Sequence, residues 1–317
     1  MKILITGSTG LLGQALTRHL ARRAEVTGLS RSAPSQPAAA RHIAANLCDA
    51  RRIAEILGAL APDVIVHAQA LSDVDRCEQE PALAHEQNVR TIEHVVNALT
   101  GRPTLVVYVS TDYVFDGTKG AAYVEADAPQ PVSVYGRSKL DGEQAALRHP
   151  RSLVVRTSTL FGPGRMNFCD HVIASLTQSR RVEAFTDQMT SPTYTEDLAE
   201  AIGAVCETLH RREAVGASRI VHIANRGGCT RLALAERIAD LLGASRALIQ
   251  PIRIADQHRP APRPRCSMLA SSVLPALLGR TLRSWDEALQ AYLRETRRLN
   301  NVPRPAGQAA GSGGNCS

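Results

Sequence analysis

The segment Tyr-Gly-Arg-Ser-Lys at residues 135–139 places a phenol four residues before an ammonium group. On a helix, this spacing puts both side chains on one face. A positive charge within about 4–6 Å lowers the pKa of a phenol, so Lys139 would make Tyr135 a better proton donor. The pair predicts proton transfer to an oxygen atom, as the reduction of a ketone requires. An isolated pair of this kind also arises by chance, so the prediction depends on the motifs around it.

A hydroxyl group is expected beside this pair. The apolar run at 104–111 reads as a strand that ends in Ser110 and Thr111, and Asp112 follows. Ligands bind at the carboxyl edge of a parallel sheet, where these side chains emerge. Thr111 would hydrogen-bond a carbonyl oxygen and stabilise the charge that develops there. The predicted catalytic residues are therefore Thr111, Tyr135 and Lys139.

Three glycines, Gly7, Gly10 and Gly13, separate the first apolar strand from an amphipathic helix. Glycine lets the backbone turn tightly and approach a pyrophosphate, which the free N–H groups at the start of a helix can bind. The spacing is G-x-x-G-x-x-G and not the commoner G-x-G-x-x-G, but the physical argument is the same. The cofactor-binding residues predicted at this turn are Gly7, Ser8, Thr9, Gly10, Leu11 and Leu12.

The end of the second strand indicates which dinucleotide binds. An acidic residue there accepts a hydrogen bond from the ribose 2′-hydroxyl, whereas an arginine accommodates a 2′-phosphate. Here the chain has Ser30, Arg31 and Ser32 and no carboxylate. NADP(H) is therefore predicted in preference to NAD(H), and Lys139 is expected to contact the nicotinamide ribose. The alternative is that Arg31 is one more surface arginine.

The elements that must position these residues alternate along the chain. Strands without internal polar alternation, separated by amphipathic helices, predict a parallel sheet that is covered on both faces. The predicted strands are 2–6, 25–30, 41–46, 63–70, 104–111, 153–158 and 219–225. The predicted helices are 11–23, 50–60, 81–99, 131–147, 166–178, 194–212, 231–243 and 284–299. The expected fold is α/β, a Rossmann-like doubly wound parallel sheet with a smaller discontinuous α/β substrate-binding domain.

The alternation loosens after about residue 165, which suggests a division into domains. The NAD(P)-binding Rossmann domain is expected at 1–165 and 194–225, and the substrate-binding domain at 166–193 and 226–299. Residues 300–317 are rich in Pro, Gly and Ser and are expected to form a flexible tail.

Composition narrows the class of protein. A hydrophobic content of 44% with 21% charged residues is ordinary for a globular chain. No apolar run approaches the roughly 18 residues that span a bilayer, and the N-terminus does not read as a leader, so a cytoplasmic location is expected. The seven cysteines are scattered without a C-x-x-C, which predicts neither disulfides nor a metal site.

The net charge of +7 is concentrated near the C-terminus, where residues 251–317 hold ten arginines against four acidic residues. A nucleic-acid partner would need interleaved aromatic residues or a recognisable motif, and this stretch has one Trp and one Tyr. The two open interpretations are a small anionic substrate such as a phosphate ester and a solvated arginine-rich surface.

Taken in order, these motifs resemble the extended short-chain dehydrogenase/reductases, and within them the dTDP-4-dehydrorhamnose reductase family, over about residues 1 to 296. The resemblance is carried by ILITGSTGLLGQ, PDVIVHAQALSDVDRCEQEP, YVSTDYVFDG, PVSVYGRSKLDGE, VVRTSTLFG, TDQMTSPTYTEDLA and RPRCSML with the later SWDEAL. It implies NAD(P)H-dependent reduction of the C4 ketone of a nucleotide-linked 4-keto-6-deoxysugar, with dTDP as the expected nucleotide.

The same resemblance implies further contacts. It places Asn46 and Leu47 beside the adenine, and His67, Ala68 and Gln69 on the turn that passes the cofactor. The implied substrate-binding residues are Leu71, Ser72, Val74, Thr111, Thr159, Asn167, Gln188 and Arg263. The planar fork of Arg263 suits a diphosphate, whereas Asn167 and Gln188 could equally have ordinary loop or helix-cap roles.

Two departures lie around the expected sugar pocket. The family commonly has T-S-W-V-Y-G where this chain has TSTLFG, with Thr159 in place of the tryptophan, and N-A-A-A-Y-T where this chain has HAQALSD. The chemistry is thus better specified than the sugar. A nucleotide-sugar epimerase and a non-catalytic NADP-binding regulatory subunit remain alternatives. The expected partner is a nucleotide-diphosphate sugar, with no nucleic acid and no membrane, and a homodimer is one open oligomeric state.

Overall fold

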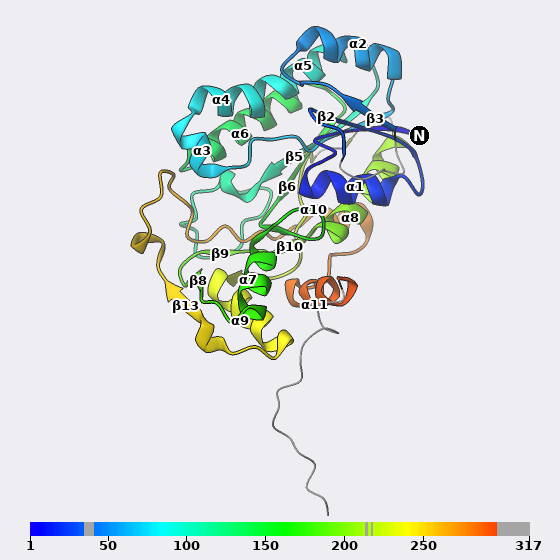
Figure 1. Ribbon diagram of the computed structural model, residues 1–317. Coiled ribbons are helices and arrows are strands. Elements are labelled where there is room, and N and C mark those ends of the chain that lie inside the picture. The colour runs from blue at the N-terminus through cyan, green and yellow to red at the C-terminus, as the bar shows by residue number, and fades with distance from the viewer. Residues whose placement is uncertain (35–40, 213–214, 217, 297–317) are drawn as a thin grey trace, which may run out of the picture.

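The computed structural model describes residues 1–34, 41–212, 215–216 and 218–296, and its centre is a seven-stranded parallel sheet (Figure 1). The strand order is β11-β6-β5-β4-β1-β2-β3, so the chain winds outward in both directions from β1 and β4. This sheet confirms the predicted α/β class and the Rossmann-like winding. The strands are β1 (Lys2–Thr6), β2 (Glu25–Ser30), β3 (Arg41–Ala44), β4 (Val64–His67), β5 (Leu105–Thr111), β6 (Ser152–Thr157) and β11 (Ile220–His222).

Helices cover both faces of the sheet (Figure 1). One face packs apolar side chains against α1 (Leu11–Leu20), α8 (Thr195–His210) and α10 (Val273–Leu278). The other face packs against α2 (Ala50–Leu60), α5 (Thr91–Ala98) and α6 (Val134–Leu147). Because the central strands are buried on both sides, they read as unbroken apolar runs in the sequence.

A second apolar cluster forms away from the sheet, in the lower half of Figure 1. It brings together α7 (Phe168–Thr177), α9 (Arg231–Leu242) and α11 (Trp285–Glu295) with the parallel pair β8 (Val182–Phe185) and β13 (Ile249–Ile252). The residue bounds given above for the two domains remain a prediction. The expected tail at 300–317 and the last three residues of the helix expected at 284–299 lie outside the described residues.

Several short elements escaped the sequence analysis. The helix expected at 81–99 is α4 (Pro81–His85), a π-helical turn η1 (Glu86–Arg90) and α5 in succession, and α3 (Val74–Gln79) precedes them. The strand expected at 63–70 ends at His67. The other short elements are η2 (Asp112–Val114), β7 (Leu160–Phe161), β9 (Met189–Thr190), β10 (Thr193–Tyr194), β12 (Cys229–Thr230), η3 (Arg246–Leu248) and η4 (Ile254–Asp256).

No helix in the part of the chain that the structure describes is long and apolar enough to span a bilayer.

The turn between β1 and α1 requires glycine for steric reasons. Gly7 has a φ of +69°, and a Cβ atom there would lie 2.8 Å from the backbone of Gln69. A Cβ atom on Gly13 would lie 2.1 Å from the carbonyl oxygen of Gly7. The turn therefore lies directly against the chain that leaves β4, which is the switch point of the sheet and the place where ligands bind in this kind of fold.

We expect Gly13→Ala to lower the free energy of unfolding by roughly 1–3 kcal/mol, because the new methyl group must displace backbone atoms. Gly58→Ala is the matched control, since Gly58 is a helical glycine in α2 with open space around it. That change should be neutral or stabilising by up to about 1 kcal/mol. Urea unfolding measures both, and equal effects of the two substitutions would contradict the steric account.

Candidate active site

The end of β5 brings together the hydroxyl and the phenol that the sequence singled out. Thr111 is the last residue of β5, and its hydroxyl lies close enough to the phenol of Tyr135, near the start of α6, to lower the pKa of that phenol. Thr111 Oγ1 also donates to Asp112 Oδ1 at 3.1 Å and accepts from the N–H of Tyr113 at 3.2 Å. A threonine hydroxyl has one hydrogen, so while it donates to Asp112 it can only accept a hydrogen bond from the phenol.

Burial dominates the acidity of both side chains on α6. It raises the pKa of Tyr135, and the neighbouring hydroxyl of Thr111 opposes this rise. It lowers the pKa of Lys139 to about 7, against the opposing charge of Glu143. The pKa of Tyr135 is thus raised overall, because desolvation of the ring and the nearby acidic groups both raise it. The effect of Lys139 on the phenol stays a prediction. Tyr135 is held as a protonated acid.

Lys139 is anchored under Tyr135 by the sheet. Its Nζ atom donates to the carbonyl oxygen of Val109 at 2.8 Å and lies 4.1 Å from the ring centroid of Tyr108. One helical turn further along, the buried carboxylate of Glu143 accepts from Ser110 at 2.6 Å and pairs with Arg156 at 2.7 Å. A buried charge needs such partners. The acid–base pair thus lies on a polar network between α6 and the ends of β5 and β6.

The glycine turn has the features that a dinucleotide needs. Gly7 and Gly10 keep the backbone open, α1 begins at Leu11, and the hydroxyl of Ser8 is buried without a hydrogen-bond partner. A buried hydroxyl normally has a partner, so Ser8 favours a ligand at this turn. Leu12 differs from its neighbours because its side chain packs in the core, which leaves only its backbone for a cofactor. The residues present fit NAD(P) at the predicted place.

The predicted 2′-phosphate site is exposed. Arg31 and Ser32 lie on the surface just beyond β2. Ser30 Oγ donates to the carbonyl oxygen of Ser32 at 2.8 Å and contacts His42 Nε2 at 2.8 Å. The Ser30 hydroxyl therefore shapes the loop, while Arg31 is the side chain that a phosphate could reach.

Of the residues expected along the adenine and nicotinamide, His67 has a side chain that a cofactor cannot reach. Its ring is fully buried between Thr6 and Thr91 and stacks on Tyr108, and burial lowers its pKa to about 3. It therefore offers no side-chain surface to a cofactor. Ala68 and Gln69 are partly exposed beside the glycine turn.

Of the two residues expected beside the adenine, one has an exposed side chain and the other a buried one. Asn46 is exposed and accepts from the N–H of Cys48 at 3.2 Å, whereas Leu47 is buried in the core. Only Asn46 thus has a side chain that a nucleotide can reach.

The loop after β4 is fixed by a buried asparagine that the sequence analysis missed. Asn88 accepts from the N–H of Leu71 at 2.7 Å and donates to its carbonyl oxygen at 3.1 Å and to Ser138 at 2.9 Å. Asn88 lies in the π-helical turn η1, and such turns are often found at functional sites. Ser72 is exposed and Val74 begins α3, so this loop presents Leu71, Ser72 and Val74 along one strip.

Beyond Tyr135 lies Tyr113, another residue that the sequence analysis missed. The two rings meet edge to face with centroids 5.8 Å apart, and Gln188 Nε2 donates to the Tyr113 hydroxyl at 3.1 Å. Gln188 thus lies near the expected reaction centre. Its signal in the sequence was weak, because nothing about a lone glutamine indicates burial.

Two residues expected to bind substrate already form hydrogen bonds within the protein. Arg263 forms a two-pronged ion pair with Asp75 at 2.9 and 2.7 Å and donates to the carbonyl oxygen of Ala261 at 2.7 Å. The fork expected to hold a diphosphate therefore holds α3. Asn167 caps α7, where its oxygen accepts from the N–H groups of Cys169 and Asp170. Its amide nitrogen donates to Gly162 and Arg165 carbonyl oxygens.

Thr159 does lie beside the site, next to a cation that the sequence analysis did not single out. Arg231 Nη2 reaches Thr159 Oγ1 at 3.4 Å, at the start of α9. Nothing in the sequence distinguished Arg231 from the many other arginines of this chain.

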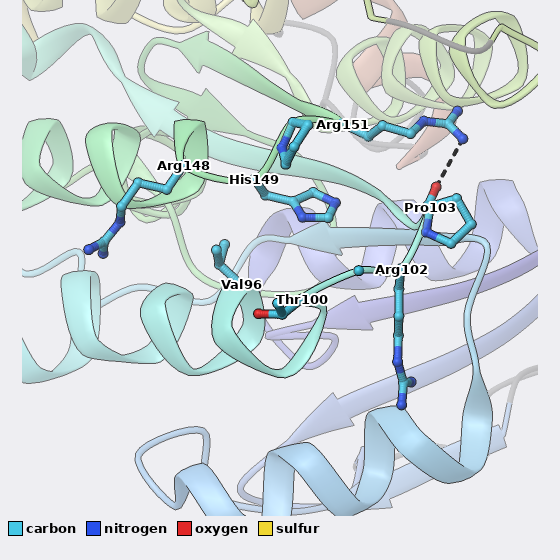
Figure 2. A pocket seen from close by; sticks show the side chains of 9 residues that line it. Val96, Thr100, Arg102, Pro103, Arg148, His149 and Arg151 are labelled. Atoms are coloured by element: carbon cyan, nitrogen blue, oxygen red, sulfur yellow. Dashed lines mark hydrogen bonds between the residues drawn. The ribbon is translucent and has the colours of Figure 1, made fainter.

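A hollow of about 500 Å³ lies elsewhere, at the loops that precede β5 and β6 (Figure 2). These loops are at the amino edge of the strands, whereas Thr111 ends β5 at the carboxyl edge. The arginines around it bind the protein itself: Arg102 donates to the Leu57 carbonyl oxygen, Arg151 to that of Pro103, and Arg148 to Glu93. Among the described residues, no group of His, Cys, Asp and Glu could hold a metal ion.

Comparison with known proteins gives one consistent result. Residues 1–298 match the model of the RmlD substrate binding domain. A dTDP-4-dehydrorhamnose reductase of Mycobacterium tuberculosis is 34% identical, with 96% of each chain covered. A Streptomyces antibioticus protein named "Probable dTDP-4,6-dihydroxy-2-methyloxan-3-one 4-ketoreductase" is 32% identical, over 98% of this chain and 100% of the relative.

A solved structure is similar over the same length. The dTDP-4-dehydrorhamnose reductase of Bacillus anthracis, in complex with NADP, superposes with a TM-score of 0.80 at 26% identity. The match covers 93% of this chain and 99% of that chain.

The desolvation of Lys139 predicts a pH-dependent cost to stability. Its pKa is about 7 in the folded chain against an ordinary 10.5, so between these values the unfolded chain holds more protons on this lysine. The cost is complete below pH 7 and disappears as the pH rises through 10.5. We expect Lys139→Met to raise the Tm most, relative to wild type, near pH 6, and progressively less toward pH 10.

Thermal unfolding across this pH range measures the effect, and Lys2→Met reports the general consequence of losing an exposed ammonium group. A difference between Lys139→Met and wild type that stays constant with pH would contradict the buried, desolvated amine.

Proposed function

The chain belongs to the RmlD substrate binding domain family of sugar-nucleotide reductases, and from this premise we propose that it reduces the C4 ketone of a nucleotide-activated 4-keto-6-deoxysugar. The proposed nucleotide is dTDP and the proposed reductant is NADPH. Residues 1–165 and 194–225 would hold the cofactor, and residues 166–193 and 226–299 the sugar nucleotide. The single observation that carries the proposal is that Thr111, Tyr135 and a buried Lys139 come together at the end of β5.

Thr111, Tyr135 and Lys139 would each have a different role in protonating the oxygen of a ketone. Bound NADPH supplies the hydride. Tyr135 is kept protonated by burial and would give its proton to the carbonyl oxygen as that oxygen gains negative charge. Thr111 would hold the same oxygen by turning its hydroxyl hydrogen from Asp112 toward it. Lys139, one turn behind Tyr135, would stabilise the phenolate that remains, because a nearby ammonium group favours the anion.

The surroundings support this division. Tyr113 packs edge to face on Tyr135 and shields the phenol from one side. Asn88 accepts a hydrogen bond from the N–H of Leu71 and donates one to Ser138 on α6. These two bonds hold the loop at Leu71 close to α6. A fixed loop and a fixed acid favour a single orientation of the ketone.

We expect Tyr135→Phe to lower kcat by at least about 100-fold, because the general acid is removed while the ring is kept. The measurement is NADPH oxidation with a panel of dTDP-, GDP- and UDP-linked 4-keto-6-deoxysugars, together with NADPH binding by fluorescence. Cofactor affinity should stay within about threefold of wild type. Tyr123→Phe is the matched control, since Tyr123 is a buried tyrosine bonded to Asp116 outside this site.

The outcomes also separate the alternatives. A wild-type chain that oxidises NADPH with none of the sugars but returns an isomerised sugar from a retained cofactor would be an epimerase. If wild type and Tyr135→Phe have the same turnover and the same cofactor affinity in every assay, the chain is a binding subunit and the proposed reaction is contradicted.

Arg31 should set the preference for NADPH over NADH. Arg31→Ala should weaken NADPH binding by roughly 10-fold, the size of one hydrogen bond to a charged group, and should leave NADH binding unchanged. Titration of both cofactors measures this, and Arg51→Ala on the exposed face of α2 serves as control. A parallel loss for NADH would show that Arg31 does not read the 2′-phosphate.

A further inference from the structure

Three arginines, Arg231, Arg259 and Arg263, lie near Tyr113. Arg231 begins α9, and Arg259 and Arg263 lie in the segment after η4. Burial raises the pKa of Tyr113, and the charges of Arg231 and Arg263 both oppose that rise. Burial likewise lowers the pKa of Arg259, and Arg263 and Arg231 lower it further. The three guanidinium groups therefore lie within electrostatic reach of one another.

Only one of the three is neutralised. Arg263 is paired with Asp75 through both prongs of its fork, and its side chain is 7% exposed. Within the described ranges, neither Arg231 nor Arg259 forms an ion pair with a carboxylate. Arg259 packs over the ring of Phe185 at 5.1 Å and donates to Gln257. The cluster thus keeps two positive charges after Asp75 is counted.

Arg231 also has an unused donor. Its Nη1 atom is buried and has no hydrogen-bond partner, while Nη2 makes a long bond of 3.4 Å to Thr159. The guanidinium carbon lies over the ring of Phe168, 4.7 Å from the centroid, which helps to hold the side chain in place. Buried N–H donors nearly always have an acceptor. The arrangement indicates an acceptor that the protein itself does not supply.

The charge of the cluster matches one part of the proposed substrate. The diphosphate of a nucleotide sugar carries two negative charges and several acceptor oxygens, and guanidinium groups bind such oxygens in pairs. We propose that Arg231 binds the diphosphate of the substrate through its guanidinium group, with Arg259 as the second cation, whereas Arg263 holds the loop in place. This inference rests on the proposed function, since it assigns the diphosphate end of the same site.

The test is the binding of dTDP to NADPH-saturated protein by calorimetry, which needs no turnover. Saturation with NADPH keeps dTDP out of the cofactor site. Arg231→Gln should raise the dTDP Kd by roughly 10- to 100-fold, the range for a hydrogen bond to a charged group. Its Tm and its NADPH affinity should stay at the wild-type values. Arg211→Gln is the control, because Arg211 is exposed at the end of α8.

Arg263→Gln provides the contrast. It should lower the Tm, because Asp75 would lose the partner that holds α3. If Arg231→Gln binds dTDP as wild type does, or if wild type binds no dTDP, UDP or GDP, the assignment of Arg231 is overturned. If dTDP binding depends on Arg231 but no keto-sugar is reduced, the anion site stands and the proposed reaction fails. If a keto-sugar is reduced but dTDP binding does not depend on Arg231, the proposed reaction stands and the assignment of Arg231 fails.

Discussion

The carboxylate of Asp112 is the point on which the arrangement of the site depends. It is fully buried and accepts hydrogen bonds from three hydroxyl groups, those of Thr111 at 3.1 Å, Ser158 at 2.7 Å and Ser267 at 2.6 Å. Burial raises its pKa and the three hydroxyl groups oppose that rise. A buried carboxylate without such donors would be strongly unfavourable. It therefore fixes the end of β5, the chain after β6 and the segment around residue 267 relative to one another.

This constraint explains why the reactive groups lie where α6 meets the sheet. The buried side of α6 is polar and small, with Ser138, Lys139 and Glu143 in place of an apolar stripe. Gly136 and Gly142 let the helix come close, since a Cβ atom would lie 2.2 Å from the Tyr113 carbonyl oxygen at the first and 2.1 Å from the Tyr108 hydroxyl at the second. A helix face that packs on a sheet is usually apolar, and departures from such a pattern are often found at functional sites.

The fold and the meeting of Thr111 with Tyr135 could be predicted because their signals are local. Apolar runs such as 104–111, the glycine turn at Gly7 and the spacing of Tyr135 and Lys139 each depend on neighbouring residues. Partners far apart in the sequence could not be predicted. The pairing of Arg263 with Asp75, 188 residues away, removes the expected phosphate fork, and the packing of β4 encloses His67. Strands of two residues, such as β7 and β10, are too short to show any period in the sequence.

The central claim is that Tyr135 protonates the oxygen of a ketone whose carbon receives a hydride from a cofactor bound over the glycine turn. The most direct measurement uses NADPH labelled with deuterium at nicotinamide C4, in each stereochemical form, with the keto-sugar nucleotide that supports turnover. The account predicts that one of the two forms delivers its deuterium to C4 of the sugar, as located by NMR. Turnover that leaves C4 unlabelled with both forms would contradict it.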